Sequence, residues 1–288
     1  MGGSLLFGFQ RFSATGLGDF VSFSNSPLQL SDRGPDYAMG FGVRVGTMYQ
    51  VAKWARLGVV ASSKIAMSRF EKYSGLFANK GNFDVPAHFG FGLALNPMKK
   101  LTFALDISHI LYEGVNSVGN KGPNADQLLS GFQTALENGL KAQRSQTKIP
   151  VNYGATSALG RSDGYGFGWN NIWVFKLGAQ YQLSDVVQLM AGYAYGQDPV
   201  ADDQALFNLI APAVVQHHLS AGLSYDLNTK KSLNLTYMKA LKAEVNGTFQ
   251  ASPEASERLA GSADIPLSYQ AEAWMSQDVF ELSYQHKF

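Results

Sequence analysis

The clearest pattern in the chain is a strict alternation of apolar and polar residues over its last ten positions. One side carries Phe280, Leu282, Tyr284, His286 and Phe288, and the other carries Glu281, Ser283, Gln285 and Lys287. Successive side chains of a β-strand point to opposite faces, so this segment predicts a strand with one apolar face. Such a strand, ending on an aromatic residue, fits a wall with hydrocarbon on one side and water on the other.

The same two-residue period recurs in four further pairs of segments, at 41–49 and 57–67, 89–95 and 101–107, 172–183 and 187–195, and 219–227 and 233–237. Short links join the members of each pair, which predicts antiparallel hairpins. One face is apolar, and we expect it to meet lipid at Trp173, Phe175, Leu177, Leu189, Tyr193, Leu223 and Leu233. The other face is polar or small, and we expect it to line a lumen at Arg44, Lys176, Gln180, Gln188 and Ser224.

The connections alternate in length along the chain. Short ones fall near 51–54, 96–100, 184–185 and 228–230, and long ones near 68–85, 114–170, 197–214 and 242–277. Membrane barrels have short periplasmic turns and long extracellular loops, so the alternation predicts a periplasmic C-terminus. With a weaker strand at 4–13 and a long loop at 14–36, we predict about ten strands. The predicted fold class is all-β: an antiparallel transmembrane β-barrel, one domain over 1–288, with short helices in the long loops.

Composition favours strands over helices as the membrane-crossing elements. The chain has 288 residues and is 45% hydrophobic. It nevertheless lacks any run of the roughly 18 apolar residues that a spanning helix needs. Charged residues make up only 16%, and 30 glycines and a 12% aromatic share suit packed strands and interfacial girdles. The net charge of +1 comes from scattered lysines and arginines, which argues against a nucleic-acid partner.

The long segment 114–170 contains the candidate ligand-binding residues. After Pro123, apolar residues recur at helical spacing, at Leu128, Leu129, Phe132, Leu136 and Leu140. They predict an amphipathic helix over the mouth of the barrel, and a second short helix is expected at 202–210. The apolar side of the first helix either cradles an alkyl chain or packs the loop onto the barrel rim. A ligand carboxylate would need a cationic partner, for which the candidates in the same loop are Lys141, Arg144, Lys148 and Arg161.

The polar motifs do not build a catalytic or metal site. His217 and His218 are adjacent, so in a strand their rings point to opposite faces. The same holds for Ser108 and His109. The segment GYGFG at 164–168 leads into a strand, so it lacks the helix terminus of a phosphate-binding loop. The absence of cysteine excludes thiolate catalysis and cysteine-ligated metals. We therefore expect no enzyme, no metal and no cofactor.

The most specific segments lie in the second half of the chain. They are KLGAQY at 176–181, MAGYAY at 190–195 followed by DPV at 198–200, AP at 211–212, HH at 217–218 and AGLSY at 221–225. Their order of strand, turn, strand, proline-flanked helix and strand is similar to the C-terminal half of FadL-type outer-membrane transporters of long-chain fatty acids and hydrocarbons. That family also includes aromatic-hydrocarbon uptake proteins. Pro86 and the strands at 89–95 and 101–106 resemble the preceding segments, so the resemblance covers most of the chain from about residue 37.

The resemblance implies a fourteen-stranded barrel of which this chain carries roughly the last ten strands. Family members begin with a hatch that carries an Asn-Pro-Ala signature, and nothing in 1–36 matches it. We therefore expect the hatch and the first strands to be missing. The implied function is passive uptake of hydrophobic small molecules across the bacterial outer membrane, and the alternative is a structural or adhesin-like barrel with interaction loops. The implied partners are a hydrophobic ligand, outer-membrane lipid and lipopolysaccharide, and the barrel-assembly machinery through Phe288. The implied assembly is a monomer.

Overall fold

The chain forms one antiparallel β-sheet in a computed structural model. The structure describes residues 1–124, 126–127, 130–131, 133, 159–201, 204, 208, 214–250, 252–253, 257 and 268–287. The strands are β1 (Gly2–Phe12), β2 (Asp36–Ala52), β3 (Ala55–Ser62), β4 (Ala66–Met67), β5 (His88–Met98), β6 (Leu101–Ile110), β7 (Ile172–Gln182), β8 (Val187–Gly196), β9 (His217–Asn228), β10 (Lys231–Gln250) and β11 (Ser268–His286).

Each strand of the main path is hydrogen-bonded to the next one along the chain. The order is β1-β2-β3-β5-β6-β7-β8-β9-β10-β11, and the short β4 pairs with β2. The predicted antiparallel all-β fold with about ten strands is thereby confirmed, and the weak strand predicted at 4–13 is β1. In the part of the chain that the structure describes, β1 pairs with β2 and β11 pairs with β10, so these are the two edge strands.

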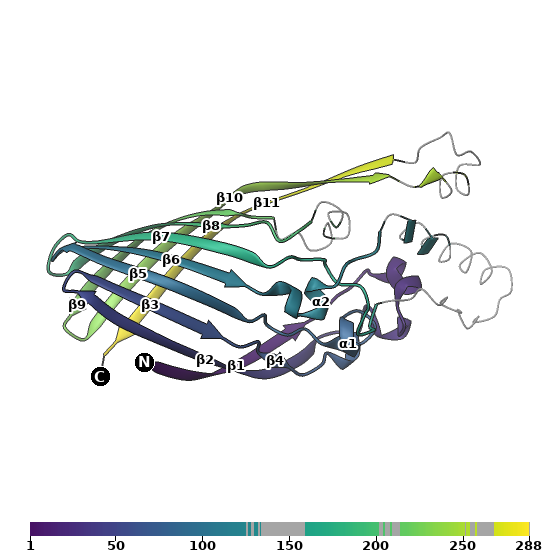
Figure 1. The fold of residues 1–288 in the computed structure, drawn as a ribbon, viewed down its shortest axis with the longest axis horizontal. Coiled ribbons are helices and arrows are strands. Elements are labelled where there is room, and N and C mark those ends of the chain that lie inside the picture. The colour runs from purple at the N-terminus through teal and green to yellow at the C-terminus, as the bar shows by residue number, and fades with distance from the viewer. Residues whose placement is uncertain are drawn as a thin grey trace.

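Short and long connections lie at opposite ends of the sheet (Figure 1). Both chain ends lie at the end that carries the short turns. The long connections hold the short helices, namely η1 (Gly18–Phe23), η2 (Pro27–Gln29), η3 (Glu71–Tyr73), α1 (Ala78–Gly81), η4 (Tyr112–Gly114) and α2 (Asn116–Gly119). The predicted alternation of connection lengths is therefore present. No described helix is long and apolar enough to cross a membrane.

One predicted loop is wrong. We expected a long loop over 242–277, but β10 continues to Gln250 and β11 begins at Ser268. A register shift between Ala240 and Ala243 marks a β-bulge, beyond which the two strands pair only with each other in the described residues. The two strands project past the rest of the sheet (Figure 1). Each strand of this arm satisfies the backbone hydrogen bonds of the other along their shared edge.

The alternation predicted from the sequence is present on the sheet. Cross-strand partners share a face, as in the rows Leu105, Leu177 and Tyr193 and Leu189 with Leu223. The residues predicted to face lipid are 38% to 54% exposed: Trp173, Phe175, Leu177, Leu189, Tyr193, Leu223 and Leu233. A continuous apolar face of this size would be unfavourable in water, and it matches the outward band of a membrane barrel.

A buried cluster lies at the loop end of the sheet, where a long connection packs against β1, β2 and β4. Phe70, Tyr73 and Phe77 are buried together, and Phe12 at the end of β1 makes ring contacts with all three. The hydroxyl of Tyr73 donates a hydrogen bond of 2.8 Å to the carbonyl oxygen of Gly34 and accepts one of 3.1 Å from the amide of Ala14. The connections before β2 and before β5 therefore form one packed unit at the loop end of the sheet.

Candidate functional site

Glycines of β5 leave room on the inner face of the sheet for side chains of β6. A Cβ added to Gly92 of β5 would lie 2.7 Å from Oδ1 of Asp106, and one added to Gly90 would lie 3.1 Å from Oγ of Ser108. Both polar side chains belong to β6, the neighbouring strand, so they lean over the glycine backbone of β5. Because glycine has no side chain, these positions accommodate the β6 side chains without loss of backbone pairing.

Two hollows lie on this face. Hollow 1 has a volume of about 700 Å³ and is lined by residues of β1, β2, β3, β5 and β6. Its polar groups include Arg44, Arg56 and Asp106, and its glycines include Gly58 and Gly92. The guanidinium Nε of Arg44 donates a 2.8 Å hydrogen bond to the hydroxyl of Ser62. Hollow 1 is thus a mostly apolar surface, built by strands, that carries a few charged groups.

Hollow 2 has a similar volume, about 710 Å³, and a different lining. It lies against β6, β7, β8, β9, β10 and β11 and against the connections that follow β6 and β8. One part is apolar and includes Ile110, Tyr112, Trp169, Ile172 and Val215. Another part carries polar groups, at Asp106, Lys176, His218 and Gln277. Asp106 and Ala104 line both hollows, so the two spaces adjoin at β6.

Lys176 is the lysine of hollow 2, and its charge is available to a ligand. Its Cα partners are Asp106 on β6 and Ala194 on β8. The carboxylate of Asp106 leans the other way, over Gly92 of β5. None of the ion pairs between described residues includes Lys176. A cation therefore stands beside an apolar wall, where a carboxylate could bind it by a charge-assisted hydrogen bond.

The loop end of hollow 2 is aromatic. The rings of Tyr112 and Trp169 meet edge to face, with centroids 5.1 Å apart and planes at 86°. Burial raises the pKa of the Tyr112 phenol above its ordinary value. The amide of Trp169 donates a 3.0 Å hydrogen bond to the carbonyl oxygen of Val118 in α2. Both aromatic residues lie in the connection between β6 and β7.

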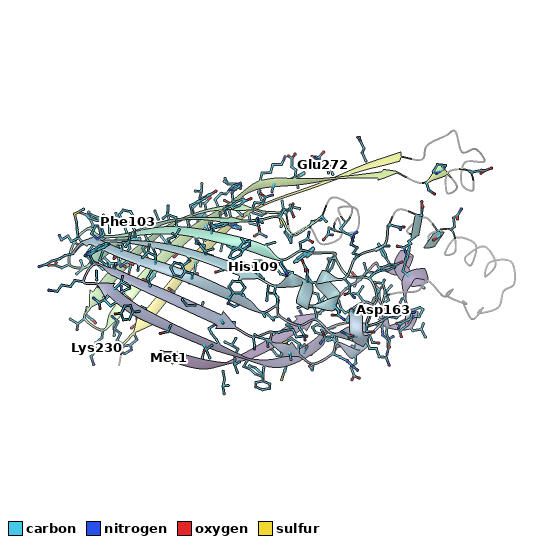
Figure 2. All side chains as sticks on the ribbon, viewed as in Figure 1. Met1, Phe103, His109, Asp163, Lys230 and Glu272 are labelled. Atoms are coloured by element: carbon cyan, nitrogen blue, oxygen red, sulfur yellow. The ribbon has the colours of Figure 1, made fainter. Side chains whose placement is uncertain are left out.

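The histidines behave as expected for adjacent strand residues. Nδ1 of His217 lies 2.7 Å from the hydroxyl of Tyr193 on the outer face, whereas His218 lines hollow 2. Figure 2 shows His109 toward the loop end of β6 and Phe103 toward the short-turn end. The ring of His109 stacks on Trp173, with centroids 4.4 Å apart. Among the described residues, no three histidines or carboxylates gather as a metal site.

A Gly-x-Ser-x-Gly sequence occurs at 160–164, the pattern of a hydrolase nucleophile elbow. In that elbow the serine stands on a sharp turn from a strand into a helix. Here Ser162 is exposed in a turn, and its carbonyl oxygen accepts hydrogen bonds from the side chains of Asn116 and Asn120. The segment then runs toward β7, not into a helix. The motif therefore lacks the backbone geometry of an elbow.

The structure separates the residues that the sequence predicted as lumen-lining. Arg44 lies in hollow 1 and Lys176 in hollow 2. Gln188 donates a 3.0 Å hydrogen bond to Gln182 near a short turn, and neither Gln180 nor Gln188 lines either hollow. The predicted loop residues lie outside the described residues: Leu128, Leu129, Phe132, Leu136, Leu140, Lys141 and Arg144.

Sequence reasoning missed the apolar part of hollow 2. Ile110, Ile172 and Val174 occupy inward positions of their strands, where the sequence otherwise has polar or small residues. This break in the alternation was the available signal. Tyr112 and Trp169 lie just beyond strand ends, and nothing in the period-two pattern distinguishes them from other loop aromatics.

Comparison with solved structures shows a shared fold. A Pseudomonas aeruginosa FadL homologue aligns with 99% of this chain at 13% identity and a TM-score of 0.52. The Pseudomonas putida toluene transporter TodX aligns with 97% at 16% identity and a TM-score of 0.50. A TodX deltaS2S3 mutant, described as a monoaromatic hydrocarbon channel, aligns with 100% at 18% identity and a TM-score of 0.52. The chain spans 62%, 57% and 55% of these three chains, respectively.

Comparison with sequences gives the family. Among curated proteins, no sequence matches the chain. The family model described as outer membrane protein transport protein (OMPP1/FadL/TodX) matches residues 13–288, which is nearly the whole chain. The chain therefore belongs to this family of outer-membrane channels, whose members are transport proteins and not enzymes.

Proposed function

We propose that this chain forms the wall of an outer-membrane channel that takes up hydrophobic small molecules without energy coupling. The observation that carries the proposal is hollow 2, where an apolar and aromatic surface adjoins the unpaired ammonium of Lys176. Membership of an outer-membrane transport family supports the same function. The ligand classes we propose are long-chain fatty acids and aromatic or aliphatic hydrocarbons, in line with the toluene transported by one structural neighbour.

The lining of hollow 2 suggests how a ligand would lie. Its hydrocarbon part would contact Ile110, Ile172 and Trp169, and a carboxylate would approach Lys176. Each buried methylene contributes about 0.8 kcal/mol, so ten methylenes contribute roughly 8 kcal/mol before the entropy of binding is subtracted. Affinity should therefore rise with chain length, and the acid group should add selectivity more than total affinity.

The same proposal includes the remaining parts of the channel. The loop helix with Leu128, Leu129, Phe132, Leu136 and Leu140 captures the ligand from water, and Lys141 or Arg144 steers an acid head group. Arg44, Lys176, Gln180 and Gln188 line the passage. The short turns and the C-terminus face the periplasm, as in other membrane barrels. Phe288 addresses the assembly machinery, and the chain is one domain of a monomer surrounded by lipid and lipopolysaccharide.

Ligand binding to a lysine variant tests this function. We would measure the affinity of dodecanoate and of butylbenzene for the full-length protein in lipid nanodiscs, as wild type and as Lys176→Met. We expect dodecanoate to bind about tenfold more weakly to the variant, because a charge-assisted hydrogen bond contributes about 1.5 kcal/mol or more. Butylbenzene has no charge, so its affinity should not change.

Lys230→Met is the matched control, since Lys230 lies in the exposed turn between β9 and β10. It should leave both affinities at the wild-type value. An equal loss for both ligands in Lys176→Met would remove the head-group role of Lys176. If neither ligand binds the wild-type protein, uptake fails and the structural or adhesin-like barrel becomes the better account.

A further inference from the structure

A buried asparagine holds the indole of Trp169 in place. Asn208, in the connection between β8 and β9, is 0% exposed. Its Oδ1 accepts a 2.6 Å hydrogen bond from Nε1 of Trp169. Its Nδ2 donates to the carbonyl oxygens of Phe167, at 2.7 Å, and Gln204, at 2.9 Å. The amide group thus uses both its donors and its acceptor, and the polar atom of Trp169 is satisfied within the protein.

The two connections around Asn208 are fastened to each other at further points. The amide of Asn170 donates a 2.8 Å hydrogen bond to the carbonyl oxygen of Pro199. The side chain of Gln204 accepts a 2.6 Å hydrogen bond from the amide of Gly122 and packs on Gly168, where an added Cβ would lie 2.6 Å from it. Gly168 has a φ of +67°, a conformation that favours glycine. The segment before β7 is therefore fixed against the segment after β8.

We propose that Asn208 is a positioning residue that sets Trp169 as an aromatic wall of hollow 2. Held in this way, the wall favours ligands with an aromatic ring over saturated rings of the same size. This inference rests on the proposed function and adds the ligand chemistry that one part of the site selects. Asn208 touches Trp169 and not the hollow, so it acts on the ligand through the indole.

The physical basis is the geometry of aromatic contacts. The edge-to-face contact with Tyr112 and the hydrogen bond to Asn208 restrain the indole in angle and position. Aromatic rings prefer offset or edge-to-face arrangements because of their quadrupoles, and a saturated ring has no such preference. A fixed indole can therefore distinguish the two ring types, whereas a mobile one offers only apolar area.

A matched pair of ligands measures this selectivity. 4-Phenylbutanoate and 4-cyclohexylbutanoate share the head group and linker and differ in ring type. We would measure the ratio of their affinities for the full chain in nanodiscs, as wild type, Asn208→Ala, Trp169→Leu and the double variant. Each single change should shift the ratio about two- to tenfold toward the saturated ligand. In the Trp169→Leu background, Asn208→Ala should cause no further shift, because its effect passes through the indole.

The fluorescence of Trp169 can itself report ligand binding in hollow 2. Trp54, Trp173 and Trp274 are exposed on the outside, whereas Trp169 lines hollow 2. With the other three replaced by phenylalanine, the emission of Trp169 should change when 4-phenylbutanoate binds. Asn116→Ala is the control, since the side-chain hydrogen bond of Asn116 goes to the carbonyl oxygen of Ser162 in the same region and not to Trp169. It should keep the wild-type ratio.

The outcomes separate this inference from the proposed function. If neither ligand binds wild type, the proposed function fails. If both bind and the ratio is the same in wild type, Asn208→Ala and Trp169→Leu, uptake stands and the selectivity inference is wrong. Additive shifts in the double variant would also overturn it. Should Asn208→Ala fail to fold, Trp169→Phe removes the same hydrogen bond by removing its donor, the indole N–H. An unchanged affinity ratio in Trp169→Phe would contradict the role of Asn208.

Discussion

On β7, the outward side chains of Trp173, Phe175 and Leu177 are large and apolar, whereas the inward residues Lys176 and Gly178 line hollow 2. The two sets alternate, so each peptide unit separates a lipid-facing residue from a lumen-facing one. A shift of one residue in register would place every apolar side chain in the lumen and Lys176 in hydrocarbon. One strand thus supplies both membrane contact and ligand contact, and adjacent substitutions should have opposite consequences.

The largest effect is expected from a charge on the outer face of β9. Leu223→Arg should lower the free energy of unfolding by about 2 to 4 kcal/mol, because an arginine near the bilayer midplane loses its hydration. Ser224→Arg, one position along the strand, faces the inner side and should cost much less. Urea unfolding in lipid vesicles, followed by circular dichroism, gives both values. Equal costs at the two positions would break the assignment of the faces.

A smaller effect is expected where two loop segments meet beside hollow 2. A Cβ on Gly166 would lie 2.7 Å from the carbonyl oxygen of Asn116 and 2.8 Å from that of Asn120. Gly166→Ala must therefore displace backbone, and it should destabilise the protein by roughly 1 to 3 kcal/mol, the usual range for overpacking. We expect the binding of 4-phenylbutanoate to weaken as well, because Trp169 follows three residues later.

Gly114→Ala is the comparison for this change. Gly114 lies in the same connection, between β6 and β7, but an added Cβ there would have no heavy atom within 4 Å. Its free energy of unfolding and its ligand affinity should both stay near the wild-type values. If Gly166→Ala were as neutral as Gly114→Ala, the close packing of the two segments around hollow 2 would not hold.

The sheet could be predicted from the sequence because its causes are local. Alternation at 172–183 and 187–195 identified β7, β8 and their faces, since the pleat assigns every second residue to one side. The arm formed by β10 and β11 beyond Ala240 could not be predicted in this way. The length of the arm depends on which strands pair with each other. Beyond the bulge, and within the described residues, β10 and β11 pair only with each other, and the period-two pattern does not identify pairing partners.

The aromatic part of the site could not be predicted from the sequence, for a different reason. Trp169 depends on Asn208 for its position, 39 residues away, and on Tyr112 in a third segment. Contacts between irregular segments produce no periodic pattern in the sequence, because neither segment has a regular backbone repeat. Lys176 could be assigned to the inner face from alternation alone. Its ammonium is unpaired among the described residues because the carboxylate of Asp106 lies over Gly92. Only the packing of the side chains shows this arrangement.

The central claim, that adjacent residues of β7 face lipid and lumen, is tested most directly by tryptophan quenching. In a chain whose four tryptophans are replaced by phenylalanine, one variant would carry Phe175→Trp and the other Val174→Trp, two positions at almost the same depth. Both would be reconstituted in bilayers containing brominated phospholipid. We predict strong quenching of the tryptophan at 175 and weak quenching of the one at 174, since Val174 lines hollow 2. Equal quenching of the two, or the reverse order, would contradict the account.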